Sequence, residues 1–249
     1  MATYAAAVAY TSPARYYKLD SNGNDSGSDG TALTFGASTA APTLNASGGS
    51  DGSGSASFDG INDYAYAPSV AWGTNAITVS VWFFSSAFSS TQVWFESSAN
   101  YNSTTGRSFL IYSDATNLQA GMFSGTGSGS VYDSVTFPLP ATGAFAHCVF
   151  IFDASASTTN RILFYKNAAA QTQSGASWQS GTGSFQTNDM YVMARGAGTL
   201  PQAAQIDDVA VWKRRLSTTE ISNLYNSVVP GGASYPPASR KAICGLSFR

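Results

Sequence analysis

The strongest pattern along the chain is an alternation of apolar and other residues over 77–84. Four apolar side chains alternate with three others: Ile77, Val79, Val81 and Phe83 with Thr78, Ser80 and Trp82. A period of two is typical of a β-strand with one face in a core. Further segments have strand character: 56–58, 63–67, 92–95, 108–112, 118–123, 131–137, 147–152, 162–166, 190–194 and 205–213. Because turn residues punctuate nearly every short gap, the pattern predicts an antiparallel sandwich.

Two helical segments are predicted beside these strands. Ser217 and Glu220 have the spacing of a capping box, in which each side chain hydrogen-bonds the backbone of the other residue, and the run 221–225 follows. The Ala-rich segment 4–10 is compatible with a short helical turn that ends before Pro13. Small and polar residues dominate 21–54, which predicts loops around short edge strands, with 45–55 forming a loop or turn.

Composition indicates a single core. The chain has 249 residues, 43% hydrophobic and 13% aromatic, which is enough to fill the space between two sheets without disulfides or metal. We predict one domain over 1–229, followed by a Pro/Gly linker and a basic arm over 230–249. The arm is a candidate for assembly onto other proteins through six residues: Tyr235, Arg240, Lys241, Cys244, Phe248 and Arg249.

Charge excludes one class of partner. Charged residues make up only 10% of the chain and the formal net charge is -2, whereas a nucleic-acid-binding face needs a basic stripe. The first ten residues contain neither a basic segment nor an apolar stretch long enough for a secretory signal or a membrane span. We therefore expect no nucleic acid, no membrane, and no export by an obvious signal.

The cysteines and aspartates leave two questions open. Cys148 and Cys244 are too few for a disulfide framework and lack zinc-site spacing. Cys148 lies in an apolar strand, which favours a buried thiol, and a bond to Cys244 is the alternative. Carboxylates near the two ends of the domain either fix turns or supply ligands to a structural calcium: Asp20, Asp25, Asp29, Asp59, Asp63, Asp207 and Asp208. No other cofactor is expected.

Several short motifs follow one another in a set order. They are the segments 4–8, 12–13, 16–20 and 23–26, then Phe58-Asp-Gly60 with Asn62-Asp-Tyr64, then 77–82, then Phe145-Ala-His-Cys-Val149, and finally 206–212, 215–217, 220–221 and 224–225. This series resembles the laminin-G-like domains of the concanavalin A-like lectin/glucanase family, including bacterial and phage members. Tyr17 stands where Trp is commoner, and 145–149 departs at two positions from the family's Trp-His-His-Val. The resemblance implies an all-β antiparallel jelly-roll sandwich with one short C-terminal helix, and it leaves the function open.

The residues that catalysis would need are missing from the pattern. The glycosidases of this fold carry Glu, one residue, Asp, two residues, Glu on a strand, and hydrolysis needs two carboxylates across a cleft. Here Glu96 is followed by Ser-Ser-Ala-Asn, and Glu220 belongs to the capping box. His147, the only histidine, lies in an apolar strand, which favours a half-buried structural side chain over a catalytic base. We expect no enzyme activity.

Glycan binding usually relies on an exposed aromatic ring beside polar side chains. The candidates lie next to polar loops: Trp94, Tyr101, Arg107, Tyr132 and Trp178. Such residues are more often core or rim packing. Trp82 and Trp212 lie in strongly patterned strands and are assigned to structure.

Two functions are compatible with this sequence. The first is a structural protein at the surface of a bacteriophage virion, a multi-copy capsid decoration or tail-associated jelly roll that docks on other virion proteins and contacts host cell-surface polysaccharide. A neutral, Ser-, Thr- and Gly-rich composition and a domain that starts near Met1 without an export signal favour it. The second is an extracellular carbohydrate-binding or adhesion module.

Overall fold

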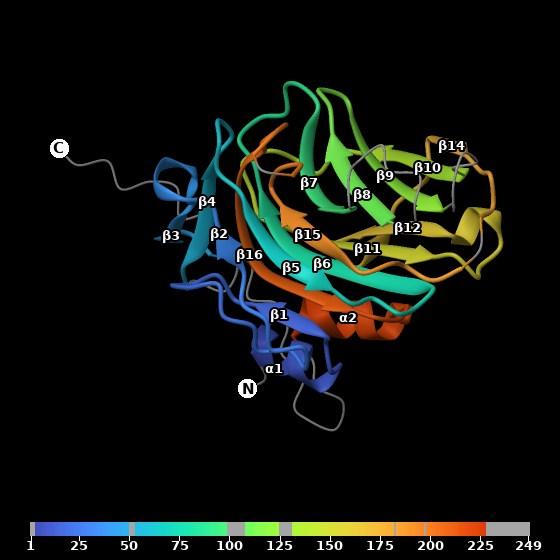
Figure 1. The fold of residues 1–249 in the computed structure, drawn as a ribbon, viewed down its shortest axis with the longest axis horizontal. Helices are drawn as coiled ribbons and strands as arrows, with labels where there is room; N and C mark the ends of the chain where they lie inside the picture. Colours follow the sequence, from blue (N-terminus) through green and yellow to red (C-terminus); the bar gives the residue numbers. More distant parts are fainter. Residues whose placement is uncertain are drawn as a thin grey trace.

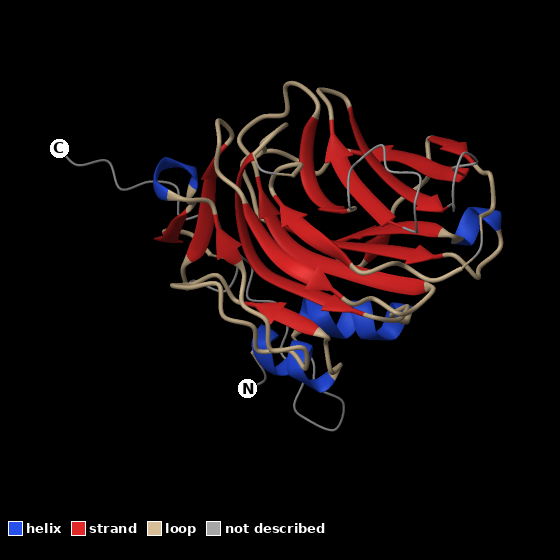
Figure 2. Cartoon of the chain, viewed as in Figure 1, coloured by secondary structure: helices blue, strands red, loops and turns tan. Residues whose placement is uncertain are grey.

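The chain folds into two antiparallel sheets packed face to face, as Figures 1 and 2 show. The computed structural model describes residues 3–49, 53–98, 108–124, 131–181, 183–196 and 198–227. Sheet A has the order β13-β12-β11-β6-β16-β4-β3, and β1 also pairs with β16. Sheet B has the order β14-β10-β9-β8-β7-β15-β5-β2. The antiparallel jelly-roll sandwich expected from the sequence is confirmed.

The strands have the following bounds. Sheet A contains β1 (Arg15–Tyr17), β3 (Thr43–Ala46), β4 (Ser55–Asp59), β6 (Ala76–Phe84), β11 (Ala146–Asp153), β12 (Ile162–Lys166), β13 (Ala169–Ala170) and β16 (Ala203–Trp212). Sheet B contains β2 (Thr34–Phe35), β5 (Ala65–Val70), β7 (Gln92–Ser97), β8 (Ser108–Ser113), β9 (Asn117–Ser124), β10 (Val131–Pro138), β14 (Gly175–Ser177) and β15 (Asn188–Val192). Two short 3-10 helices, η1 (Ser38–Ala40) and η2 (Thr158–Asn160), lie in connections.

The central strands of sheet A are buried on both faces, and this explains the composition of β6. Its residues Ile77, Val79, Val81 and Phe83 belong to the core between the sheets. Trp82 faces the other way, into a second apolar cluster formed with α1 (Tyr4–Tyr10) and α2 (Thr218–Asn226). Figure 1 shows both helices against the side of sheet A that faces away from sheet B. Within the described part of the chain, neither α1 nor α2 covers the outward face of sheet B.

Both predicted helical segments are confirmed. Ser217 is the N-cap of α2, and both hydrogen bonds of its capping box with Glu220 are present. Thr3 caps α1, because its Oγ1 accepts a hydrogen bond from the Ala6 N–H at 3.2 Å. The loop predicted over 45–55 was wrong at both ends, because β3 extends to Ala46 and β4 begins at Ser55, where the two strands pair. Among the described residues, no helix is long and apolar enough to cross a membrane.

His147 is more deeply buried than expected. The predicted side chain was half-buried, but the ring is fully buried beneath α1. Its Nε2 lies 2.8 Å from Ser80 Oγ and 3.1 Å from the Tyr4 hydroxyl. Such a buried polar group is stable because it is hydrogen-bonded. This contact ties the N-terminal helix to the middle of sheet A, which agrees with a structural role.

Glu220 at the start of α2 gives an acid-sensitive contribution to stability. The Arg214 guanidinium donates to Glu220 Oε1 at 2.6 Å, and this bond, with those from Ser217, lowers the pKa of Glu220 to about 2. Since the folded pKa lies below the unfolded value of 4.5, the charge stabilises the fold above about pH 4.5, and the effect is lost as pH falls through about 2. Solvent screens the exposed pair, so Glu220→Gln should cost about 1 kcal/mol at neutral pH.

Urea unfolding of wild type and Glu220→Gln across this pH range measures that difference. Glutamine also fits the third position of a capping box, so the substitution isolates the charge. The difference in unfolding free energy between the two proteins should disappear as the pH falls from about 4.5 to about 2. A gap that does not change with pH would contradict the role given to Glu220.

Candidate functional site

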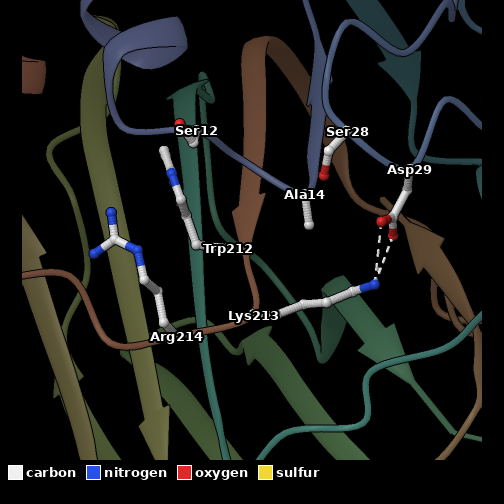
Figure 3. A pocket seen from close by; sticks show the side chains of 7 residues that line it. All are labelled: Ser12, Ala14, Ser28, Asp29, Trp212, Lys213 and Arg214. Carbon is white, nitrogen blue, oxygen red and sulfur yellow. Dashed lines mark hydrogen bonds and ion pairs between the residues drawn. The ribbon is translucent and has the colours of Figure 1, made fainter.

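One hollow lies where the N-terminal segment meets the end of β16 (Figure 3). It has a volume of about 350 Å³ and is lined by Ser12, Ala14, Ser28, Asp29, Trp212, Lys213 and Arg214. Its charged groups are paired: Lys213 Nζ lies 2.9 Å from Asp29, and Arg214 lies 2.6 Å from Glu220. Trp212 Nε1 donates to the Thr11 hydroxyl at 3.1 Å. These contacts fasten the N-terminal segment to sheet A, and we assign the hollow a structural role.

A row of tyrosines on the outward face of sheet B is the strongest candidate for a binding surface. Tyr64 and Tyr66 have ring centroids 6.4 Å apart, and Tyr66 and Tyr191 have centroids 5.7 Å apart, with the rings within 28° of parallel. Tyr66 is paired with Tyr191 across β5 and β15. All three rings are half-exposed. We call Tyr64, Tyr66 and Tyr191 the tyrosine ladder.

The backbone of β5 and β15 determines the direction of these rings. Ala65 and Ala67 on β5 and Met190 and Val192 on β15 point into the core. The residues between them must then point outward, because successive side chains of a strand alternate between faces. Small alanines thus occupy the inside of β5 while large tyrosines occupy the outside. Such half-exposed rings are not needed to fill the core.

A buried ion pair lies beside the ladder on β7. Glu96 is paired with Tyr191 across β15 and β7, and only 2% of its surface is exposed. Arg195 Nε donates to Glu96 Oε2 at 3.0 Å, and the Ser98 hydroxyl donates to the other carboxylate oxygen. The two charges offset each other, which is the usual condition for a carboxylate at this depth.

A second hollow opens at the β15 end of the ladder. Its volume is about 240 Å³, and it is lined by Ser69, Ser98, Thr187, Asn188, Asp189 and Tyr191. We call it the ladder hollow. Burial, followed by the charge of Asp189 and the neighbouring tyrosines, raises the pKa of Tyr191 above its usual value. The phenol therefore stays neutral at physiological pH and offers an uncharged aromatic wall beside polar groups.

The structure corrects one predicted site residue and separates two others from the ladder. The prediction that Trp94 offers a glycan platform is wrong, because the side chain is fully buried and stacks on Phe83 with centroids 3.7 Å apart. Trp178 is half-buried against the core. Tyr132 on β10 is half-exposed, and the centroids of its ring and the Phe123 ring are 4.3 Å apart. The strands β7, β8 and β9 separate Tyr132 from the ladder strand β15.

The remaining predicted residues lie outside the described part of the chain. These are Tyr101 and Arg107, together with the proposed arm residues Tyr235, Arg240, Lys241, Cys244, Phe248 and Arg249. Cys148 is buried, and burial raises the pKa of its thiol far above the usual value. A bond to Cys244 stays an untested alternative. Tyr64 belongs to one of the motifs that carry the family resemblance, but none of the ladder tyrosines was among the candidate binding residues taken from the sequence.

The aspartates largely behave as turn residues. Asp25 Oδ1 accepts the N–H groups of Tyr16 and Gly27 at 2.8 and 2.7 Å, and Asp59 Oδ1 accepts the Ile61 N–H at 2.8 Å. Within the described ranges, no group of three or more His, Cys, Asp or Glu side chains is placed to hold a metal ion. Structural calcium stays an untested prediction.

The two-sheet fold, with the tyrosine ladder on the outward face of sheet B, defines a jelly-roll β-sandwich of the concanavalin type. A family model described as the concanavalin A-like lectin/glucanases superfamily matches residues 58–222. The chain belongs to this superfamily, as the sequence resemblance implied. A comparison with curated proteins finds no match.

Solved structures share the fold at low sequence identity. The receptor binding domain of botulinum neurotoxin C/D mosaic serotype has a TM-score of 0.64 at 10% identity over 87% of this chain and 51% of its own. The botulinum neurotoxin serotype D ligand binding domain, solved with N-acetylneuraminic acid, has a TM-score of 0.62 at 12% identity. The match covers 88% of this chain and 52% of the toxin domain. Domain 4 of an extracellular arabinanase from Geobacillus stearothermophilus, solved with arabinotriose, has a TM-score of 0.58 at 16% identity. The match covers 86% of this chain and 98% of the arabinanase domain. The chain thus spans about half of each toxin domain and nearly all of the arabinanase domain.

Proposed function

We propose that this protein is a non-enzymatic module that binds a glycan on the outward face of sheet B. The observation that carries the proposal is the tyrosine ladder beside the ladder hollow. Aromatic rings present an apolar face to the C–H groups of a sugar ring, while a few nearby polar groups orient its hydroxyls. The ladder supplies the first element, and the Ser, Thr, Asn and Asp side chains of the hollow supply the second.

The glutamates support binding without hydrolysis. Glycoside hydrolysis requires a pair of carboxylates facing the scissile bond. Glu96 is buried in an ion pair with Arg195, and Glu220 is engaged in the cap of α2 over sheet A. Two of the similar structures were solved with a saccharide, N-acetylneuraminic acid in one and arabinotriose in the other, which adds support for a glycan as the ligand.

Replacing Tyr191 with alanine tests the site. Loss of one stacking platform should weaken glycan binding about 5- to 30-fold, as is usual for a central aromatic contact. The unfolding free energy should fall by only about 1 kcal/mol, because the ring is half-exposed and contributes one cross-strand pair. A glycan array followed by calorimetric titration of the strongest hit measures the affinity, and urea unfolding measures the stability.

Two further variants complete this test. Tyr191→Phe keeps the ring and should retain most of the affinity. Tyr132→Ala removes a comparable half-exposed ring across the sheet and should leave the affinity unchanged. A flat array with folded wild-type protein, or full binding by Tyr191→Ala, would overturn the proposal.

The setting of this module is a second proposal. We propose a bacteriophage virion surface, where the module docks on other virion proteins in many copies and meets host cell-surface polysaccharide. The supporting observation is the neutral, hydroxyl-rich composition, with only 10% charged residues. Mass spectrometry of purified particles should find the chain among the structural proteins. Its absence from all particles would leave an extracellular adhesion module as the alternative.

A further inference from the structure

We propose that Asp189 makes the ladder hollow selective for uncharged sugars over carboxylated ones. This inference rests on the proposed glycan-binding function and names the class of ligand. It starts from the position of one carboxylate in the hollow. A single uncompensated charge in a small hollow is enough to discriminate between ligands that differ by one charge.

A bulge between β5 and β15 holds Asp189 in place. Asn188 pairs with Val70 and Met190 pairs with Ala67, so Pro68 and Ser69 together lie opposite the single residue Asp189. Such bulges redirect side chains and are common next to binding sites. Pro68 has no N–H to give to the sheet. The carboxylate thus lies where regular strand pairing is interrupted.

Ser69 completes the bulge in a costly conformation. Its φ of 48° is in the left-handed region, which a serine adopts only when its surroundings require it. The conformation turns the Ser69 N–H toward Asp189, and the N–H donates to Oδ1 at 2.8 Å. One carboxylate oxygen is thereby anchored to the backbone. Among the described residues, no other hydrogen bond is made to Asp189, so Oδ2 is left as an acceptor on a side chain that lines the hollow.

The described residues around the hollow leave the charge of Asp189 uncompensated. The five other lining side chains are neutral: Ser69, Ser98, Thr187, Asn188 and Tyr191. Beside the ladder, the opposite charges of the ion pair between Glu96 and Arg195 sum to zero. No ion pair within the described residues involves Asp189. The described lining of the ladder hollow therefore carries one net negative charge.

This charge acts in opposite directions on the two classes of sugar. A carboxylate is an acceptor only, so Asp189 can take hydrogen bonds from the hydroxyls of a neutral sugar. A uronic or sialic acid brings a second carboxylate, which repels the first, and the aromatic wall weakens the screening by water. We expect carboxylated ligands to bind about tenfold or more weakly than their neutral partners, and the gap should narrow in about 0.5 M salt.

Matched ligand pairs and one charge-removing variant test the inference. The first pair consists of galactose oligomers and galacturonate oligomers. The second pair consists of xylose oligomers and the same oligomers bearing glucuronate. In Asp189→Asn, one oxygen still accepts hydrogen bonds but the charge is gone, so the neutral-to-acidic affinity ratio should fall about tenfold. Asp114→Asn is the control, because it removes the same charge from the β8–β9 turn. Its ratio should stay within about twofold of wild type.

The outcomes separate this inference from the proposed function. Binding of neutral probes with equal binding of acidic ones, or an unchanged ratio in Asp189→Asn, would overturn the role of Asp189 and leave glycan binding intact. If folded wild-type protein binds neither class, both proposals fail. The supporting result is a neutral-to-acidic affinity ratio that falls in Asp189→Asn and stays constant in Asp114→Asn.

Discussion

Replacing Asp133 with alanine should lower the free energy of unfolding by about 3–5 kcal/mol, because it leaves a buried guanidinium without its counter-charge. Asp133 on β10 is 1% exposed and Arg161 is 3% exposed. Arg161 Nε and Nη2 lie 2.8 and 2.7 Å from Asp133 Oδ2. The other oxygen accepts the N–H groups of Gln179 and Ser180 at 2.8 and 2.9 Å.

The position of this pair explains the size of the effect. Asp133 lies in sheet B, and Arg161 immediately precedes β12 of sheet A, so the ion pair joins the two sheets. Arg161 Nη1 also donates to the Ala154 carbonyl at 2.6 Å. The pair thus holds together two sheets and the segment that follows β14. Loss of Asp133 removes the ion pair and the two hydrogen bonds from the Gln179 and Ser180 N–H groups, and it leaves the Arg161 charge buried.

Urea unfolding of three proteins measures the effect. Asp114→Ala is the matched control, since its carboxylate lies near the surface and caps one turn, and it should cost about 1 kcal/mol. A double variant, Asp133→Val with Arg161→Met, should be more stable than Asp133→Ala, because no charge is left buried. If Asp133→Ala loses no more stability than Asp114→Ala, the inter-sheet pair does not have the assigned role.

The sequence predicted the parts of the fold in which local pattern and burial agree. The alternation of β6, the apolar run of β11 and the capping box of α2 all appear where expected. In β6 the side chains that face sheet B are large and apolar, so the period of two indicates which face meets the core, although Thr78 and Ser80 on the other face are buried as well. The short strands β13 and β14 have no such pattern, because their residues are mostly exposed.

The candidate site could not be found in the same way. In β5, Ala65 and Ala67 are fully buried and Tyr66 is half-exposed, the reverse of the order that residue size suggests. Only the pairing of β5 with β15 brings Tyr66 to Tyr191, which is 125 positions later in the sequence. The bulge that places Asp189 likewise depends on the pairing of two distant strands. A pattern within one segment contains no information about either contact.

The prediction that placed Trp94 at a binding surface was wrong for a specific structural reason. The same reason makes Trp94→Ala the second variant with a large expected loss of stability. The pairing of β7 with β8 shifts between Val93 and Phe95, so strict alternation fails, and Trp94 and Phe95 both belong to the core. Trp94 Nε1 donates to Ser113 Oγ at 3.0 Å and Gln202 Oε1 at 3.2 Å. Trp94→Ala should therefore lower the unfolding free energy by about 3–5 kcal/mol, from the cavity and the lost hydrogen bonds.

Two variants distinguish this core role from a binding role. Trp94→Phe keeps a ring on Phe83 and loses only the indole N–H and some volume, so it should cost about 1–2 kcal/mol and leave glycan affinity unchanged. Trp178→Ala, the same kind of truncation at a half-buried tryptophan, should cost less than Trp94→Ala. Loss of glycan binding in a stably folded Trp94→Phe protein would contradict a purely structural Trp94. It would also direct attention away from the tyrosine ladder.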